Sequence, residues 1–590
     1  MQNRALPVDS RGRMRLSTRR ITLCITRRTA RHKERSMPRM TGKQGLIRML
    51  EAEAIGYVFG NPGTSEGPIL DALEDSRGLE YVLSTQEGVA MGMADGYARA
   101  TGKPAFVNLH IETGLANGIS LLHNANEGGT PMVLTSANKD IRKLAEGRTQ
   151  LAEMTRMFTK WSAEVTHPEQ IPSVMRRAFT EAMTPPTGPA YVAFSANALD
   201  DEADMDIVPS ASGYPRVHPD PRAVADASEL LSRADNPIIV VGDRLAQSGG
   251  VSEAVRLAEL TGATVYAASY SEMNFPTDHP QFMGRIAPGM PAGQALLSRG
   301  DVVLAVGTNV FSGFFYFSGP ALGSATKLIH IDSAYAEIGK SEPTDIGIAA
   351  DPKSALANLS DALESDMTGT ARESARVRVA GLTQAKAEQV AARERCLRDR
   401  WDLSPMSAER MMHEIAAVLP PDTIIADDSV TSRDAVHDAI AFNEPGSVFG
   451  ERGGALGWGM GGAMGVKLAN PDRPVVGVIG DGSAMMTVQA LWTAANSRIP
   501  VVYVICNNRA YRILKLNMNA YKTQILGEQD PQSDYLAMDF PTPMNIAGIA
   551  EAIGVHSRKI ENPGDLGPAM RRALDLGAPA VLDVSIDGTV

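Results

Sequence analysis

The chain is poor in several features that mark specialised classes of protein. Only three of its 590 residues are cysteine, and Cys24, Cys396 and Cys506 stand far apart, without the spacing of a metal site or a disulfide framework. Sparse, isolated cysteines are typical of reduced cytosolic proteins, so we expect a cytoplasmic location. No apolar run reaches the roughly 18–20 residues that span a bilayer. The sequence therefore argues against both a disulfide scaffold and a membrane-spanning protein.

Basic charge and nucleotide-binding motifs are scarce as well. The formal net charge of −11 argues against a protein that binds nucleic acid or a membrane surface, because such proteins show basic stripes. The nearest approach to a P-loop, residues 96–103, has the wrong spacing and is followed by Pro104, where a metal-binding hydroxyl belongs. A GxGxxG fingerprint between a strand and a helix is also missing. We therefore expect neither nucleic acid nor a membrane as a partner.

The first 39 residues differ from the rest of the chain. They hold eleven arginines and one lysine against two acidic residues, a composition that is also typical of a transit peptide. Because regular fold signals begin only near Thr41, we favour a different interpretation. The segment is a disordered basic leader, or it precedes a true start at Met37 or Met40.

Beyond this leader, short apolar runs alternate with longer amphipathic ones. Such alternation predicts repeated βαβ units, and a chain of this length is too long for one core. We predict an α/β fold of three doubly wound parallel-sheet domains at residues 40–200, 201–370 and 405–590. A charged, partly helical stretch at 371–404 is predicted as a linker.

The predicted strands are short apolar runs bounded by turn residues. They lie at 57–59, 81–83, 105–109, 132–134 and 190–194 in the first domain, at 238–241, 302–306 and 328–331 in the second, and at 423–426, 475–479, 501–506 and 580–584 in the third.

One stretch of the third domain carries a distinctive chemical pattern. A predicted strand runs into Gly480-Asp481-Gly482-Ser483, and after a helical stretch from Met485 the next strand ends at Asn507-Asn508. Because parallel strands end at one edge of a sheet, Asp481 and Asn508 can converge on a hard cation such as Mg²⁺. The small residues between them let backbone N–H groups meet a phosphate. The pattern favours a metal-anchored diphosphate, and the alternative is an Asp and two Asn that merely end strands.

This pattern resembles the diphosphate-binding motif of thiamine diphosphate enzymes. The run QEGVAMGMADGYARATGKP, which begins at Gln86, resembles the pyrimidine-binding region of the same family. The resemblance covers about residues 41–586 and implies pyrimidine-binding, central and diphosphate-binding domains in that order. It implies that Glu87 hydrogen-bonds the aminopyrimidine ring, whereas taken alone Glu87 is an ordinary first-turn acid.

The resemblance also implies the rest of the cofactor site, with thiamine diphosphate and Mg²⁺ as cofactors. Leu456, in the run 453–457, matches the apolar residue that wedges beneath the cofactor, although leucine is by default a core residue. In this family the pyrimidine-binding and diphosphate-binding domains of different subunits face one another. A homodimer is therefore implied as the minimum active unit, and a homotetramer is expected. The implied cofactor-side residues are Val430, Thr431, Gly482 and Ser483, and the implied metal ligands are Asp481, Asn508 and the backbone oxygen of Ala510.

Three further motifs resemble the benzoylformate decarboxylases. FGNPGTSE, NLH and FPTDHP follow one another in the same order as in that family. The match implies that His110 and His279 are active-site histidines, and histidine suits proton transfer near neutral pH. The substrate-contacting serine of the family matches Thr64, with Ser65 next to it. Taken singly, His110 is equally well a strand-end cap and His279 a packed loop residue.

The function implied by the resemblance is non-oxidative decarboxylation of a 2-oxo acid to an aldehyde. Two phenylalanine positions of the family's pocket fall on Gly450 and Asn517, and Glu112 adds a carboxylate near His110. This composition favours a substrate that is smaller or more polar than benzoylformate. The alternatives are carboligation, as in acetolactate synthases, and C–C bond formation, as in 2-hydroxyacyl-CoA lyases.

A non-catalytic scaffold protein is a hypothesis of another class. It predicts the loss of Glu87, Asp481 or Asn508, and all three are present. A flavin-dependent oxidase that uses the central domain for FAD is a further possibility that the sequence leaves open.

Overall fold

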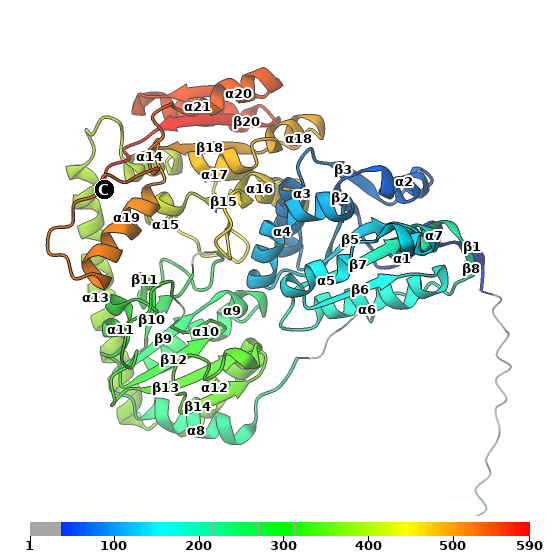
Figure 1. Ribbon diagram of the computed structural model, residues 1–590. Helices are drawn as coiled ribbons and strands as arrows, with labels where there is room; N and C mark the ends of the chain where they lie inside the picture. The colour runs from blue at the N-terminus through cyan, green and yellow to red at the C-terminus, as the bar shows by residue number, and fades with distance from the viewer. Residues whose placement is uncertain (1–36, 212, 214–215, 270, 312) are drawn as a thin grey trace, which may run out of the picture. The chain divides into compact units, whose positions relative to one another are not determined.

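The computed structural model of the chain describes residues 37–590, except 212, 214–215, 270 and 312. The predicted leader therefore lies outside the described residues up to residue 36. Residues 39–41 form strand β1 (Arg39–Thr41), which pairs antiparallel with β8 (Glu202–Asp204). Besides this ribbon, the described chain contains three parallel sheets of six strands, each flanked by helices (Figure 1). The predicted fold of three doubly wound parallel-sheet domains is confirmed.

The first sheet has the strand order β3-β2-β4-β5-β7-β6. All five predicted strands are present, and β6 was not predicted because its half-buried edge sequence, WSAEV, is interrupted by polar residues. The elements are β2 (Tyr57–Asn61), β3 (Glu80–Leu83), β4 (Ala105–Leu109), β5 (Met132–Asn138), β6 (Trp161–Val165), β7 (Pro189–Ser195), α1 (Gly42–Ala52), α2 (Gly67–Glu74), α3 (Glu87–Thr101), α4 (Ile111–Gly128), α5 (Leu151–Thr155), α6 (Ile171–Met183), α7 (Ala196–Asp200) and the 3₁₀ turns η1 (Thr64–Glu66), η2 (Ile141–Glu146), η3 (Arg156–Phe158) and η4 (Pro168–Gln170).

The second sheet has the order β11-β10-β9-β12-β13-β14. Its three predicted strands are present, and the unpredicted ones are only four residues long. The elements are β9 (Pro237–Val241), β10 (Thr264–Ala267), β11 (Phe282–Arg285), β12 (Val302–Val306), β13 (Lys327–Asp332), β14 (Ile346–Ala349), α8 (Pro221–Ser232), α9 (Asp243–Gln247), α10 (Val251–Thr261), α11 (Pro291–Leu297), α12 (Pro352–Asp366) and the turn η5 (Tyr335–Glu337).

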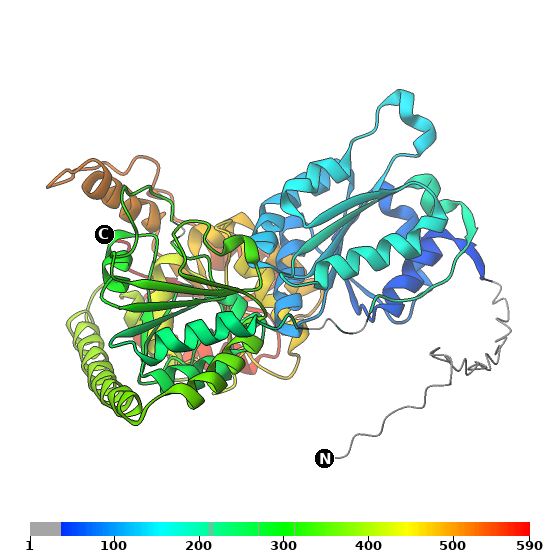
Figure 2. The same ribbon diagram turned by 90° about the horizontal axis from the view of Figure 1, so that it is seen from below.

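The predicted linker is more regular than expected. Residues 369–399 form one helix, α13 (Gly369–Asp399), which Figure 2 shows as a single long rod. Its N-cap, Thr368, accepts a hydrogen bond from the backbone N–H of Ala371. Nearly all of its side chains are exposed or half-buried, so the charged composition that suggested a linker instead belongs to a solvated helix.

The third sheet has the order β16-β15-β17-β18-β20-β19. Its four predicted strands are present, and the helix after β17 begins at Asp481 rather than at Met485. The elements are β15 (Ile424–Asp428), β16 (Val448–Gly450), β17 (Val475–Gly480), β18 (Val502–Asn507), β19 (His556–Ile560), β20 (Ala580–Ser585), α14 (Ala408–Ala416), α15 (Arg433–Ala439), α16 (Trp458–Ala469), α17 (Asp481–Met486), α18 (Ala490–Asn496), α19 (Arg512–Ala520), α20 (Ile546–Ile553), α21 (Pro563–Asp575), the 3₁₀ turn η6 (Val430–Ser432) and the π-helical turn η7 (Tyr521–Ile525).

In each sheet the chain order reverses beside the first strand. These reversals lie between β2 and β4, between β9 and β12, and between β15 and β17. At such a point the connections leave in opposite directions and open a crevice at the carboxyl ends of the strands. The predicted site residues of the first and third domains follow strands at these edges.

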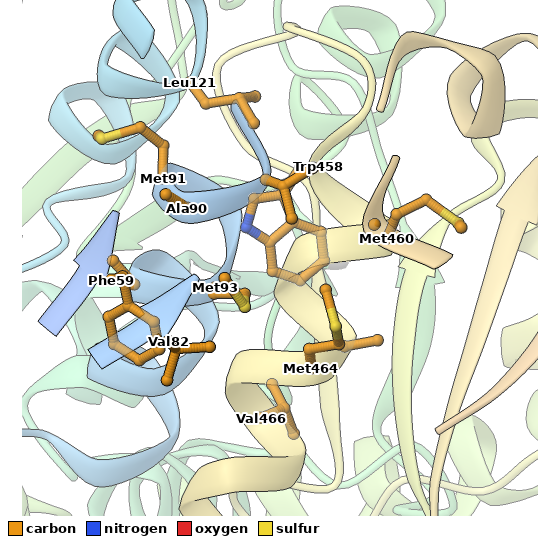
Figure 3. Close-up of a cluster of buried hydrophobic side chains, with 14 of the residues drawn as sticks. Phe59, Val82, Ala90, Met91, Met93, Leu121, Trp458, Met460, Met464 and Val466 are labelled. Atoms are coloured by element: carbon orange, nitrogen blue, oxygen red, sulfur yellow. The ribbon is translucent and has the colours of Figure 1, made fainter. Parts of the chain in front are cut away.

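Helices α3 and α16 pack against one another and share one hydrophobic core. Figure 3 shows Met93 of α3 beside Trp458 and Met464 of α16. A Cβ atom at Gly465 would lie only 1.9 Å from the backbone oxygen of Met93, so glycine is required where the two helices approach most closely.

A group of buried and half-buried charged residues lies near this helix pair and connects the domains of all three sheets. Arg452 donates to the backbone oxygen of Gly128 (2.6 Å) and to Glu272 (2.5 Å), and it lies 3.2 Å from Asp243. Arg99 reaches the same Glu272 at 3.3 Å. We call Arg99, Arg452, Asp243 and Glu272 the junction charges.

Candidate active site

Glu87 is the first residue of α3 and is buried at the carboxyl edge of the first sheet. Its Oε1 accepts a hydrogen bond from the side-chain amide of Asn61 (3.0 Å), at the end of β2. Its Oε2 accepts one from the amide of Asn117 (3.1 Å), in α4. The two amides hold the carboxylate in one orientation. Asn117 lies thirty residues away in the chain and was not identified from the sequence.

His110 is the N-cap residue of α4 and lies beside Glu87. An ideal Cβ at Gly114 would lie 3.1 Å from both Glu87 Oε1 and His110 Cβ. His110 Nδ1 lies 2.8 Å from Glu66 Oε2 and 2.9 Å from Ser65 Oγ. Sequence reasoning gave Glu66 no role, because these contacts bring together residues that lie in separate βα turns.

The hydroxyl beside His110 belongs to Ser65 and not to Thr64. Both residues lie in η1, but Thr64 is exposed whereas Ser65 is half-buried against the imidazole ring. The preceding Gly63 allows this arrangement, since a Cβ there would lie 2.2 Å from His110 Nδ1. Any larger residue at position 63 would displace the ring.

The backbone after His110 is in an unfavourable conformation. Ile111 has φ of +21°, which a β-branched residue rarely adopts, and its N–H points to Glu66 Oε1 at 3.4 Å. The next residue, Glu112, has one carboxylate oxygen buried without a hydrogen-bond partner among the described residues. Backbone strain of this kind is concentrated at functional sites in proteins.

The predicted metal ligands lie together at the carboxyl edge of the third sheet. Asp481 follows β17 and Asn508 follows the neighbouring strand β18. The carboxylate of Asp481 accepts from the backbone N–H groups of Gly482 and Arg509, both at 2.7 Å. The amide oxygen of Asn508 accepts from the N–H of Ala510 at 3.0 Å. One carboxylate, one amide oxygen and one backbone carbonyl thus come from adjacent turns.

The hydrogen bonds of Asp481 do not fully compensate for the burial of its carboxylate. Desolvation raises the pKa of its carboxyl to about 6, and the hydrogen bonds from Gly482 and Arg509 offset only part of the effect. A divalent cation would supply the missing positive charge, and three hard oxygen donors suit Mg²⁺. In the described part of the chain, no group of three or more His, Cys, Asp or Glu side chains is arranged for a metal.

Asp428, at the end of β15, is a second buried carboxylate of this edge. Its Oδ2 accepts from the N–H groups of Gly457 (3.2 Å) and Gly459 (2.9 Å) and from the hydroxyl of Ser483. Its Oδ1 is buried without a hydrogen-bond partner in the described residues. Desolvation, and next the negative charge of Glu451, raise the pKa of Asp428 to about 7. We call Asp428, Asp481 and Ser483 the edge group.

The other predicted cofactor residues are neighbours of the edge group in the sequence or lie next to a residue that hydrogen-bonds to it. Val430 and Thr431 are half-buried in η6, and Val430 has φ of +52°. Gly482 is buried in the first turn of α17. Leu456 is half-buried in the loop before α16, next to Gly457, whose N–H also donates to Ser483 Oγ at 2.9 Å.

His279 is held within the central domain. Its Nδ1 accepts a hydrogen bond from the N–H of Gln281 (3.3 Å), and its Nε2 lies 3.5 Å from the carboxylate of Glu259. Its ring packs edge-to-face on Phe275. The described contacts do not bring His279 to His110, so the two predicted histidines lie in separate groups in this chain.

Comparison with known proteins agrees with this geometry. Models of the N-terminal TPP-binding domain, the central domain and the C-terminal TPP-binding domain of thiamine pyrophosphate enzymes match residues 40–157, 224–359 and 429–584. The chain belongs to the thiamine pyrophosphate enzyme family. The two sheet edges with Glu87 and Asp481 thus lie in its N-terminal and C-terminal TPP-binding domains, and the resemblance inferred from the sequence is confirmed.

Individual thiamine pyrophosphate enzymes are similar over nearly the whole chain. Benzoylformate decarboxylase of Pseudomonas aeruginosa is 31% identical, with 91% of this chain and 97% of that protein covered. The "Probable acetolactate synthase large subunit" of Methanococcus aeolicus is 28% identical, with 93% and 92% covered. The solved structure of a 4-hydroxybenzoylformate decarboxylase from Rhodococcus jostii is 27% identical, with a TM-score of 0.79 and 93% and 99% covered.

Among the described residues, no helix combines the length and the hydropathy that crossing a bilayer requires.

Proposed function

We propose that the protein catalyses the thiamine diphosphate- and Mg²⁺-dependent, non-oxidative decarboxylation of a 2-oxo acid to an aldehyde. The observation that carries the proposal is the group of Ser65, Glu66 and His110 beside Glu87. It supplies a proton-transfer side chain and a hydroxyl next to the glutamate predicted for the cofactor. The similarity to a benzoylformate decarboxylase supports the same reaction.

The residues present fit the cofactor. The edge group leaves a buried oxygen of Asp428 unpartnered and a buried carboxylate at Asp481 short of positive charge. When bound, thiamine diphosphate supplies the electron sink that carbanion chemistry at a carbonyl carbon requires. Glu87 would hold its aminopyrimidine ring and Leu456 would lie beneath it. Val430, Thr431, Gly482 and Ser483 would hold the diphosphate, and Asp481, Asn508 and the backbone oxygen of Ala510 would hold Mg²⁺.

The protein's own groups would then orient the substrate and move protons. Ser65 offers its hydroxyl to the substrate carboxylate, with Thr64 exposed one residue earlier. Because His110 Nδ1 faces Glu66, Nε2 is the ring nitrogen left to exchange a proton with the reacting molecule. His279, in the central domain of the facing subunit, would contribute to the same site.

We propose a substrate that is smaller or more polar than benzoylformate. The positions at which the family's pocket carries phenylalanine hold Gly450, at the end of β16, and Asn517, in α19. Less apolar surface there means less burial of an aromatic ring. The unpartnered oxygen of Glu112 offers a hydrogen-bond acceptor close to His110.

The proposed working form is a homodimer at minimum, assembled as a homotetramer in the cytoplasm. In this arrangement the pyrimidine-binding domain (40–200) of one subunit completes its site with the diphosphate-binding domain (405–590) of another. The central domain (201–370) and the segment 371–404 connect these two domains along the chain.

Carboligation is the second candidate. Acetolactate synthase relatives align over the same length, at 28% identity. In that reaction, or in that of a 2-hydroxyacyl-CoA lyase, the carbon nucleophile meets a second carbonyl compound instead of a proton. The histidine beside Glu87 favours protonation, so we rank decarboxylation first.

The test is CO₂ release by the purified protein with thiamine diphosphate and Mg²⁺, over aromatic, aliphatic and acidic 2-oxo acids. We expect turnover on one class, with the Glu87→Gln variant inactive but still folded. If the cofactor binds and no acid releases CO₂, decarboxylation is refuted. Product formation only after a second aldehyde or 2-oxo acid is added would assign the carboligase function.

A further inference from the structure

Glu66 is a fully buried carboxylate that joins three strand ends of the first sheet. Its Oε2 accepts from the N–H of Gly63 (3.1 Å), after β2, and its Oε1 accepts from the N–H of Ala137 (3.1 Å), in β5. The N–H of Ile111, after β4, points to Oε1 at 3.4 Å, and the Ser65 hydroxyl lies 2.9 Å from both oxygens. Apart from His110, each neighbour that the described residues give this carboxylate donates a hydrogen bond, so both oxygens act as acceptors.

These contacts determine which ring nitrogen of His110 is protonated. An imidazole nitrogen 2.8 Å from an acceptor must itself bear the hydrogen, so Nδ1 is the protonated nitrogen of His110. In the neutral ring Nε2 is then unprotonated. The side chain of His110 is 33% exposed at the sheet edge.

We propose that Glu66 is a positioning residue that holds His110 in the Nδ1–H tautomer and presents Nε2 to the substrate. The role rests on the proposed function, in which His110 exchanges a proton with the reacting molecule. Glu66 itself is buried and acts only through the histidine, as a buried carboxylate does behind a catalytic histidine in other enzymes.

Replacing Glu66 by glutamine reverses the tautomer. The glutamine has one acceptor oxygen, and two backbone N–H groups, those of Ala137 and Ile111, point to the Oε1 position whereas one points to Oε2. The oxygen therefore takes the Oε1 position and the amide NH₂ faces His110. Nδ1 must then accept, and the proton moves to Nε2.

The experiment is ¹⁵N NMR of the full-length protein labelled at the histidine ring nitrogens, with and without thiamine diphosphate and Mg²⁺. The chain has ten histidines, and the His110→Asn variant identifies the signals of His110. We expect a protonated Nδ1 in the wild type and a protonated Nε2 in Glu66→Gln. The decarboxylation kcat of Glu66→Gln should fall by about 10²–10⁴-fold with KM little changed, because substrate contacts remain.

A matched control is the carboxylate beside the other predicted histidine. Glu259 lies 3.5 Å from His279 Nε2, but its side chain is 62% exposed and water can replace it. Glu259→Gln should leave the His110 signals unchanged. The Ser65→Ala variant distinguishes the effects of the two neighbours of Nδ1. If the Nδ1–H tautomer is retained, Glu66 holds it; if the tautomer is lost, the role belongs to Ser65.

Two results would overturn the proposal. One is a wild-type His110 with its proton on Nε2, which is decisive even if Glu66→Gln fails to fold. The other is a folded Glu66→Gln protein with an unchanged tautomer. Both are read without turnover, so they are distinct from failure of the proposed function, which would appear as an absence of CO₂ release.

Discussion

The junction charges and the edge group both hold carboxylates largely away from solvent, but only at the junction do arginines face them. Burial alone would raise the pKa of Asp243, yet Arg452, Ser271 and Asn274 outweigh it and hold the pKa below its ordinary value. At the sheet edge the pKa values of Asp428 and Asp481 are raised to about 7 and about 6. A paired carboxylate of this kind becomes costly when its partner is removed, whereas uncompensated burial is typical of ligand-binding and catalytic sites.

Loss of charge should have different consequences in the two regions. A junction charge that loses its partner remains buried and unpaired, so stability suffers. An edge carboxylate that is neutralised relieves an existing cost, so stability is kept while the affinity for metal and cofactor is lost. Variants in the two regions therefore separate folding from binding.

The largest effect is expected for Arg452→Met. The substitution leaves the largely buried Asp243 and Glu272 without their main cation, which should destabilise the protein by about 3–5 kcal/mol. The measurement is the first transition of urea and thermal unfolding. The control is Arg376→Met, since the pair of Arg376 with Glu373 is exposed and should change stability little. Equal stability of the two variants would contradict the role given to the junction.

The next effect is expected for Asp481→Asn. The variant should bind thiamine diphosphate with Mg²⁺ at least about 10–100-fold more weakly, because it loses a charged metal ligand. Its unfolding temperature without cofactor should not fall. Asp243→Asn, at the junction, should show the opposite pattern, with lower stability and an unchanged affinity. Calorimetric titration gives both affinities, and a shared pattern would refute the distinction.

The smallest effect is a pH dependence of the cofactor-free protein. Because the folded-state pKa of Asp428, about 7, exceeds its ordinary value of 3.8, the folded state holds this proton more tightly than the unfolded state. The corresponding stability is present below about pH 4 and is lost as the pH rises to about 7. Asp428→Asn should remove this part of the slope between pH 4 and 7 in thermal unfolding. An identical slope in the variant would show that Asp428 does not cause it.

Much of the fold could be predicted from local pattern. The strand 105–109 was placed to the residue, because it is a buried apolar run between turn residues. The strands that escaped prediction, such as β6, β10 and β16, are short or half-buried, so their sequence pattern is weak. The helical nature of 369–399 was underestimated because exposed charge is equally compatible with a linker and with a solvated helix.

The motifs of the candidate site could be predicted from the sequence, but the residues that orient its side chains could not. Glu87, His110, Asp481 and Asn508 are recognisable because each follows a strand within a distinctive run. Asn117, which orients Glu87, has no comparable run around it and reaches the carboxylate only through the packing of α4. The choice of Ser65 over Thr64 depends on a side-chain direction, which spacing along the chain does not encode.

The sequence by itself determined the family and the three parallel-sheet domains and predicted the candidate site residues, because periodicity and strand-end motifs are local properties. Only the tertiary structure decided which of those residues are paired. It placed Glu66 behind His110, separated His279 from His110, and buried Asp428 and Asp481 so that the pKa values of their carboxyls are raised. The physical reason is that hydrogen bonding and desolvation depend on distances of a few ångströms between segments that are remote in sequence.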